Sequence, residues 1–273
     1  MKDSIENQNK AVSISSATRC VIFVVAFAAY LAVGYAYSFG LDFVSTEGLV
    51  RTGVAADMLC GRVIGRQGVV CSINFTPIPT LAVAALGIFD SLLQKCFAAV
   101  AISALFGALA VALFDLLCMS ITRSRAIRYL LVVVFFLFPA MIVHAASGTS
   151  TTMLVCCALA LLYFGREWAL KKQVKHLLAF AVLTGLSPMV NWRGFVLGVI
   201  AATALAVTTI IRGENASERK GLLWVLVFPF IYMIATWIGL NWVTMGIRCL
   251  PSKSFGEALP CGVGPKHLLS ATG

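Results

Sequence analysis

Long apolar stretches alternate with short polar segments along the chain, and this alternation predicts the architecture. Seven apolar stretches approach or exceed the roughly 18 to 20 residues that a helix needs to cross about 30 Å of hydrocarbon. They are residues 20–37, 97–118, 129–146, 151–164, 176–190, 194–211 and 222–243. Because a helix satisfies its backbone hydrogen bonds within one segment, we predict an all-α, polytopic transmembrane bundle of about seven spanning helices.

A further apolar stretch, residues 78–93, is shorter and opens beside Pro77 and Pro79. Proline is tolerated in the first turn of a helix but breaks its interior. At about 16 residues this stretch falls short of a full crossing. We therefore expect a short or re-entrant helix here.

Basic clusters separate the later apolar stretches, at residues 123–128, 166–175 and 212–220. Cytoplasmic loops carry an excess of Lys and Arg, so these clusters and the N-terminus are predicted to face the cytoplasm. That arrangement requires the stretch at 78–93 not to cross. The expected order is a cytoplasmic N-terminus at 1–19, a helix bundle at 20–246 that includes an outer loop at 39–77, and an extracytoplasmic tail at 247–273.

The composition of the chain is typical of a protein that is surrounded by a lipid bilayer. Hydrophobic residues make up 60% of it and charged residues 12%, with a mean hydropathy of +0.94, whereas soluble domains are about 25% charged. The net charge of +10 does not indicate nucleic-acid binding, because the basic loops are too short to form a docking domain. No small-residue cleavage site follows the first apolar stretch, so we interpret it as a retained anchor. We expect an integral protein of a bacterial cytoplasmic (inner) membrane, in contact with membrane lipids.

Four of the nine cysteines, Cys60, Cys71, Cys249 and Cys261, fall in the two long outer segments. In an oxidising compartment, pairs of Cys60 with Cys71 and Cys249 with Cys261 would close two small loops, each worth about 3 kcal/mol. Cross-pairing between loop and tail is equally allowed by the sequence, as are four unpaired thiols. No Cys-x-x-Cys occurs, so the spacing does not indicate a zinc site.

The first outer loop collects charges of both signs. Its acidic and basic side chains are those of Asp42, Glu47, Asp57, Arg51, Arg62 and Arg66. Such a mixture suits a phosphate-bearing or metal-bound ligand. Between positions 44 and 58 the apolar residues, among them Leu49 and Val54, recur near helical spacing. This pattern predicts an amphipathic helix that lies along the membrane interface or packs on the bundle.

Few ionisable residues lie within the apolar stretches. Asp90, Asp115 and His144 all lie near stretch ends, and solvated or snorkelling positions are expected for the two aspartates. Arg193 differs, since an isolated cation on an apolar outer rim is well placed to meet a lipid phosphate. Its neighbour Trp192 is typical of an interface anchor.

Three features of the sequence resemble the N-terminal half of the polytopic C-type membrane glycosyltransferases, the superfamily of protein mannosyltransferases and lipid A aminoarabinose transferases. The first is the acidic residues soon after the first helix, Asp42 and the TEG at 46–48. The others are the NFTPIPTL at 74–81 and the NWVTMG at 241–246. Where the family usually has an adjacent acidic pair, this chain has Thr46 and Glu47.

The resemblance implies transfer of a sugar from a polyprenyl-phosphate donor, in an outward cavity lined by helix ends. Glu47 is then the residue that engages the acceptor or a divalent metal, with Asp57 and Asp42 as further acidic candidates. The leaving phosphate requires positive groups, and the candidates for this role are Arg51, Arg62, Arg66 and Arg193.

Two other functions remain open from the sequence. A non-catalytic subunit of a larger membrane complex fits the abundance of Gly and Ala, which permits close approach of other membrane helices. A transporter or flippase would need a substrate path, and the sequence shows neither buried charge pairs nor paired broken helices.

Overall fold

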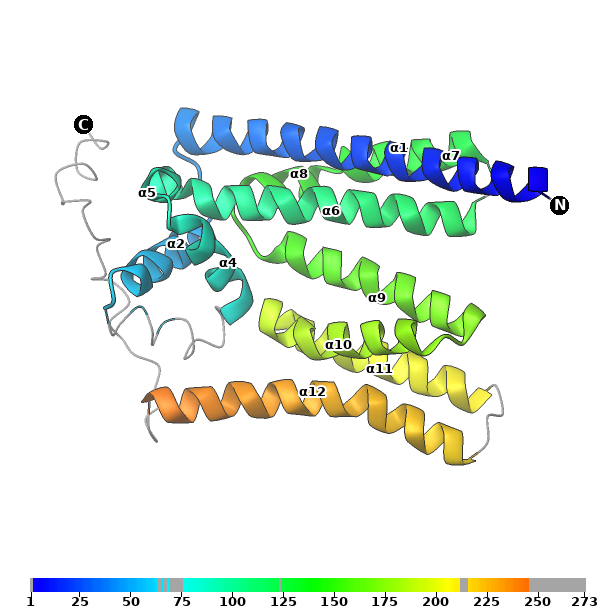
Figure 1. Cartoon of the computed structure of the whole chain (residues 1–273). Coiled ribbons are helices and arrows are strands. Elements are labelled where there is room, and N and C mark those ends of the chain that lie inside the picture. The colour runs from blue at the N-terminus through cyan, green and yellow to red at the C-terminus, as the bar shows by residue number, and fades with distance from the viewer. Residues whose placement is uncertain are drawn as a thin grey trace.

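The computed structural model describes residues 2–62, 65, 68, 76–122, 124–211 and 216–245. These ranges are helical and contain no strand. Figure 1 shows long helices that run side by side, with a layer of shorter helices at one end. The all-α class is therefore confirmed, while the predicted tail at 247–273 lies outside the described residues.

Four helical segments are long and apolar enough to cross a membrane. They lie in α1 (Lys2–Tyr35) with its π-helical extension η1 (Ala36–Gly40), α6 (Phe97–Ile121), α9 (Thr151–Lys171) and α12 (Ala216–Met245). Each contains one of the stretches that the sequence predicted to span. An integral membrane protein is the plain consequence of their length and composition.

The span expected at residues 129–146 is broken into α7 (Arg125–Phe136) and α8 (Pro139–Ala146), which meet at 52°. Pro139 causes the break, because it lacks an N–H and disfavours helical geometry in the residue before it. Phe138 accordingly has φ −61° and ψ 123°. Counted as one span, this pair raises the number of candidate spans from four to five.

The predicted count of about seven spans is not confirmed, because α10 (Val174–Val190) and α11 (Arg193–Ile211) are shorter apolar helices. At about 1.5 Å per residue, the 17 residues of α10 extend about 26 Å, slightly less than the hydrocarbon core of about 30 Å. A total of seven requires both helices to cross.

The stretch at 78–93 forms a short helix, as predicted. This stretch is covered by α4 (Pro77–Gly87) and the single turn α5 (Asp90–Leu93). The 3-10 turn η2 (Gln94–Cys96) follows it. Pro77 lies in the first turn of α4, where its missing N–H leaves no helical bond unmade.

The helix of the first loop, α2 (Thr46–Leu59), forms where the apolar spacing predicted it, and it buries polar as well as apolar side chains. Val54 is buried, but Leu49 is 53% exposed while Arg51 and Asp57 are 1% and 2% exposed. Lipid is as apolar as a protein core, so burying Leu49 would gain little, whereas polar groups find partners only inside the protein. The predicted helix is confirmed, and the burial of its two charged side chains was not predicted.

The two ends of the bundle differ in charge. Figure 1 places the N-terminus and the α6–α7, α9–α10 and α11–α12 junctions at one end, here called the basic end. Exposed cations at these junctions are Arg125, Lys172, Lys175 and Lys220. The opposite end, here called the α2 end, carries α2, α4 and α5. The fold thus agrees with the predicted alternation of basic and non-basic loops.

The core has two parts that meet along α6 and α9. Around Tyr30 of α1, alanines of α6 such as Ala104 and Ala108 are fully buried and let the helices approach closely. The second part gathers Trp168 of α9, Phe180 of α10 and neighbours from α11 and α12. A third cluster on α6, α8 and α9 joins the two parts.

Candidate functional site

The strongest concentration of buried polar contacts lies at the α2 end, around Arg51. Ser45 caps α2 by accepting a hydrogen bond from the Gly48 N–H at 3.0 Å, which fixes where the helix begins. Glu47 in the first turn and Arg51 one turn later then lie on the same face of α2. That face packs against α4 and the α8–α9 turn.

Arg51 is 1% exposed and donates hydrogen bonds to two other segments of the chain. Its guanidinium donates to the Thr76 carbonyl at 2.9 Å, the Thr80 hydroxyl at 2.8 Å and the Ser150 hydroxyl at 3.5 Å. Burial lowers the pKa of Arg51 from its ordinary value, while the charge of Glu47 acts in the opposite direction. Arg51 therefore connects α2 to α4 and to the start of α9, and its donors are directed into the protein.

Glu47 is held on one side only. Its Oε1 accepts from Arg51 Nε at 2.9 Å and from the Ser150 N–H at 3.0 Å. Within the described residues, all of its contacts use Oε1, and 24% of the side chain is exposed. Oε2 thus has no partner among the described residues, and the side chain as a whole is partly exposed.

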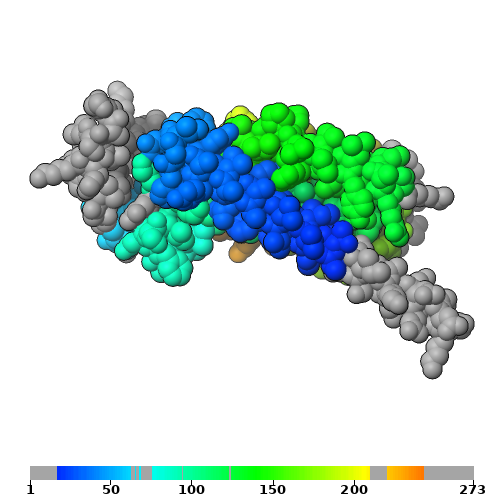
Figure 2. All heavy atoms as spheres, turned by 90° about the horizontal axis from the view of Figure 1, so that it is seen from above, coloured from blue at the N-terminus to red at the C-terminus, as the bar shows by residue number. Residues whose placement is uncertain are grey.

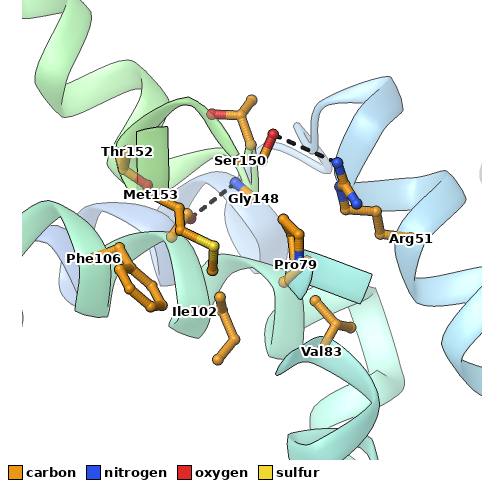
Figure 3. Close-up of a pocket in the computed structure, with 12 residues that line it drawn as sticks. Arg51, Pro79, Val83, Ile102, Phe106, Gly148, Ser150, Thr152 and Met153 are labelled. Atoms are coloured by element: carbon orange, nitrogen blue, oxygen red, sulfur yellow. Dashed lines mark hydrogen bonds between the residues drawn. The ribbon is translucent and has the colours of Figure 1, made fainter. Parts of the chain in front are cut away.

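Ser150 extends the cluster to the start of α11. Its hydroxyl, shown beside Arg51 in Figure 3, also accepts from the Asn191 amide at 2.8 Å. Asn191 in turn accepts from the Arg193 N–H at 3.0 Å. The exposed Arg193 guanidinium lies 5.5 Å from the centre of the Trp192 ring. Glu47 is thus linked through Ser150 and Asn191 to the backbone of Arg193, far away in the sequence.

The α8–α9 turn reaches Glu47 because two glycines let backbones approach. A Cβ on Gly48 would lie 3.2 Å from the carbonyl oxygens of both Ser147 and Gly148. Gly148 has φ +80°, a conformation that favours glycine, and its N–H donates to Ser103 of α6 at 3.1 Å. A larger residue at either position would push the turn away from α2.

The cavity at this cluster is small, with a volume of about 10 Å³ between Arg51, Ser103, Ser150 and Thr152. That volume is close to the minimum for a single water molecule. Figure 3 shows Arg51 and Ser150 on one side of it and Phe106 and Met153 on the other. A sugar or phosphate would therefore have to approach Glu47 from its exposed side, and Arg51 is too deeply buried to meet it.

Other predicted residues of the first loop lie in separate pairs. Asp57, whose side chain is 3% exposed, accepts from Arg62 at 3.0 Å. Asp42 pairs with Lys95, and both are largely exposed. Asp42, Lys95 and the adjacent Cys96 have positive φ values of 48° to 57°.

Cys60 is disulfide-bonded in the structure. Cys71, Cys249 and Cys261 lie outside the described residues, as does Arg66, so the pairing scheme and the role of Arg66 stay predictions.

The described residues contain no group of three or more His, Cys, Asp or Glu side chains that could bind a metal ion. Glu47 is the only carboxylate whose contacts make up the Arg51 cluster, in the part of the chain that the structure describes. A divalent metal at Glu47 would therefore need ligands from elsewhere.

Asp115 differs from the sequence expectation. It is 0% exposed, and Arg128 donates to its two carboxylate oxygens at 2.6 Å and 2.5 Å. The sequence did not reveal this pair, because the two residues lie on different helices, α6 and α7, and meet only after those helices pack. The expected solvated or snorkelling position is wrong, and the absence of buried charge pairs no longer counts against a transporter.

Sequence reasoning singled out the segments at 147–150 and 191–193 as polar helix ends but gave them no connection to Glu47. Thr76 and Thr80 lie inside the NFTPIPTL motif. The sequence therefore pointed to this segment but assigned no role to either threonine. What the structure adds is the convergence of these segments on one arginine.

Comparison with protein-family models, with curated proteins and with solved structures finds no match to this chain.

Proposed function

We propose that this protein is a membrane glycosyltransferase-like enzyme that acts on a polyprenyl-phosphate sugar at the extracytoplasmic face of the membrane. The observation that carries the proposal is Glu47, a partly exposed carboxylate that is fixed through one oxygen, on the end opposite the basic loops. The excess of Lys and Arg at the basic end supports a cytoplasmic N-terminus and hence an outward α2 end.

Sugar transfer needs a carboxylate to accept the proton of the acceptor hydroxyl. Glu47 is suited to this because Arg51 and the Ser150 N–H hold it in one orientation before substrate arrives. The departing phosphate needs a nearby positive charge. Of the candidate arginines within the described ranges, Arg193 and Arg62 are accessible, whereas Arg51 acts on Glu47 as a positioning residue.

The test is transfer of radiolabelled sugar from a polyprenyl-phosphate donor, in membranes that contain either the wild type or Glu47→Gln at matched expression. Glutamine keeps the acceptor oxygen for the Ser150 N–H but cannot take up a proton. We expect the transfer rate to fall by about 10² or more.

Asp90→Asn is the matched control, since Asp90 is an exposed carboxylate of α5 at the same end of the bundle and outside the Arg51 cluster. Its transfer rate should equal that of the wild type. Transfer that survives Glu47→Gln, or that is equally lost in the control, would contradict the proposed role.

A second candidate is a non-catalytic subunit of a membrane complex. The favouring observation is α12, whose apolar segment Lys220–Trp242 is only 6% buried and exposes Trp224, Phe228 and Tyr232. An obligate subunit is degraded when its partner is absent. Absence of transfer in the wild type, together with loss of the chain in cells that lack a co-purifying membrane protein, would favour this function.

A further inference from the structure

A second hollow lies far from Glu47, on the membrane-facing flank of α1 and α6. It has a volume of about 480 Å³ and is lined by Arg19, Cys20, Phe23, Val24, Leu109, Ala112, Leu113 and Leu116. In Figure 2, α1 crosses this face of the molecule, with the green residues of α7 and α8 along one flank. The groove is apolar except at one end, where Arg19 lies.

Among the lining residues from α6, Ala112 is the smallest and the other three, Leu109, Leu113 and Leu116, are leucines. Val24 is 59% exposed and Leu109 is 38% exposed at the far end of the groove. Since the surrounding helices are candidate spans, this apolar surface faces the interior of the membrane.

Arg19 lies two residues inside the start of the candidate span Ala17–Gly40, the depth at which a basic side chain reaches the headgroup layer. It belongs to the basic end, where Arg125, Lys172 and Lys220 are exposed. The acidic residues Asp115 and Glu167 of this end are each paired with a cation, and with Asp3, Glu6 and Glu218 included, the acidic residues here are still outnumbered by Lys and Arg. The charge around the mouth of the groove thus favours an anion.

The length of the groove distinguishes between a lipid and a partner helix. From Leu109 to Leu116 it extends about 10 Å along α6, about a third of the hydrocarbon core. A spanning helix would need contact along most of the core and a stripe of small residues to approach closely. One cation above a short apolar groove matches a lipid of a single leaflet.

We propose that this groove binds one anionic phospholipid, with its phosphate at Arg19 and an acyl chain against Ala112 and Leu113. The lipid belongs to the leaflet at the basic end, so the site is distinct from Glu47 and does not depend on catalysis.

The test uses the full chain, purified in detergent and titrated with phosphatidylglycerol or phosphatidylcholine of identical acyl chains. Native mass spectrometry counts the retained lipid. We expect the wild type to prefer phosphatidylglycerol by about fivefold, the effect of one cation at the membrane surface. Arg19→Gln should remove this preference, and Ala112→Phe, which fills the groove, should weaken retention of both lipids.

Arg125→Gln is the matched control, because Arg125 is an exposed arginine of the same end that does not line the groove. It should keep the preference. A phosphatidylglycerol carrying a photoreactive acyl chain should label peptides 19–24 and 109–116.

Three results would overturn the proposal: an unchanged preference in Arg19→Gln, an equal loss in Arg125→Gln, or labelling confined to other helices. If Ala112→Phe disrupts association between protein chains and leaves lipid retention unchanged, the groove holds a helix and the proposal is wrong. Unchanged thermal unfolding of each variant shows that the effects are local.

Discussion

Two arginine–carboxylate pairs lie at opposite ends of this bundle, and they are built differently. Near the basic end, Arg128 and Asp115 bind each other through two hydrogen bonds, and Asp115 is fully buried. At the α2 end, Arg51 holds one oxygen of Glu47 and also donates to Thr76, Thr80 and Ser150. The first pair is closed on itself, whereas the second leaves a partly exposed carboxylate.

The difference suggests separate roles. A carboxylate whose two oxygens are both bound by one arginine has little capacity left for a ligand, so the Asp115–Arg128 pair serves to hold α7 on α6. A carboxylate fixed by one oxygen keeps the other for chemistry. Burial of charge alone therefore does not identify a functional site, whereas incomplete satisfaction beside an accessible surface does.

The largest expected effect comes from breaking the closed pair. Asp115→Asn removes the charge that compensates Arg128, and we expect the free energy of unfolding to fall by about 3 to 5 kcal/mol. Denaturant titration of the purified protein in mixed micelles measures this loss.

The double variant Asp115→Leu with Arg128→Met sharpens the same point. An uncharged pair of similar volume needs no compensation, so most of the stability should return. A double variant as unstable as Asp115→Asn would mean that the pair itself, and not the orphaned arginine, sets the stability.

A smaller effect is expected at the open pair. Arg51→Gln removes charged hydrogen bonds to Thr80 and the Thr76 carbonyl, but Glu47 is partly exposed and can be hydrated. We expect a loss of about 2 to 3 kcal/mol in the free energy of unfolding, measured in the same titration.

Lys95→Gln provides the comparison, because Lys95 pairs with Asp42 and both side chains are largely exposed. This variant should lower the free energy of unfolding by no more than about 1 kcal/mol. Equal effects of Arg51→Gln and Lys95→Gln would show that the extra donors of Arg51 contribute nothing measurable.

The smallest effect concerns how the open pair is positioned. Ser45→Ala removes the cap of α2, and we expect a loss of about 1 kcal/mol, with Ser45→Gly less harmful. Thermal unfolding in detergent would rank the two variants. An alanine variant as stable as the wild type would show that Ser147, whose carbonyl accepts from the Ser45 N–H at 3.1 Å, suffices to fix the start of the helix.

Much of the candidate site was visible in the sequence as separate pieces. Glu47 and Arg51 stand one helical turn apart, which is enough to predict their pairing once a helix is assigned. Ser150 and Asn191 were recognisable only as polar residues at helix ends. The contact of Asn191 with Ser150 and that of Ser150 with Arg51 join residues 41 and 99 positions apart in the chain, and no local pattern encodes such packing.

Tertiary packing also decided features that the sequence pattern described incorrectly. The apolar pattern of α2 gave no sign that Arg51 and Asp57 of the same helix are buried as well. Residues 129–146 scored as one span by hydropathy, yet Pro139 divides them into two helices.

By itself, the sequence determined the helical class, the approximate positions of the apolar helices and the common location of the basic loops. These properties depend on segment length, hydropathy and charge, which act locally. Only the tertiary structure decided which carboxylates have both oxygens bound by a partner and which are held through one oxygen alone. That distinction depends on which helix ends meet, because a buried polar group takes whatever partner the packing supplies.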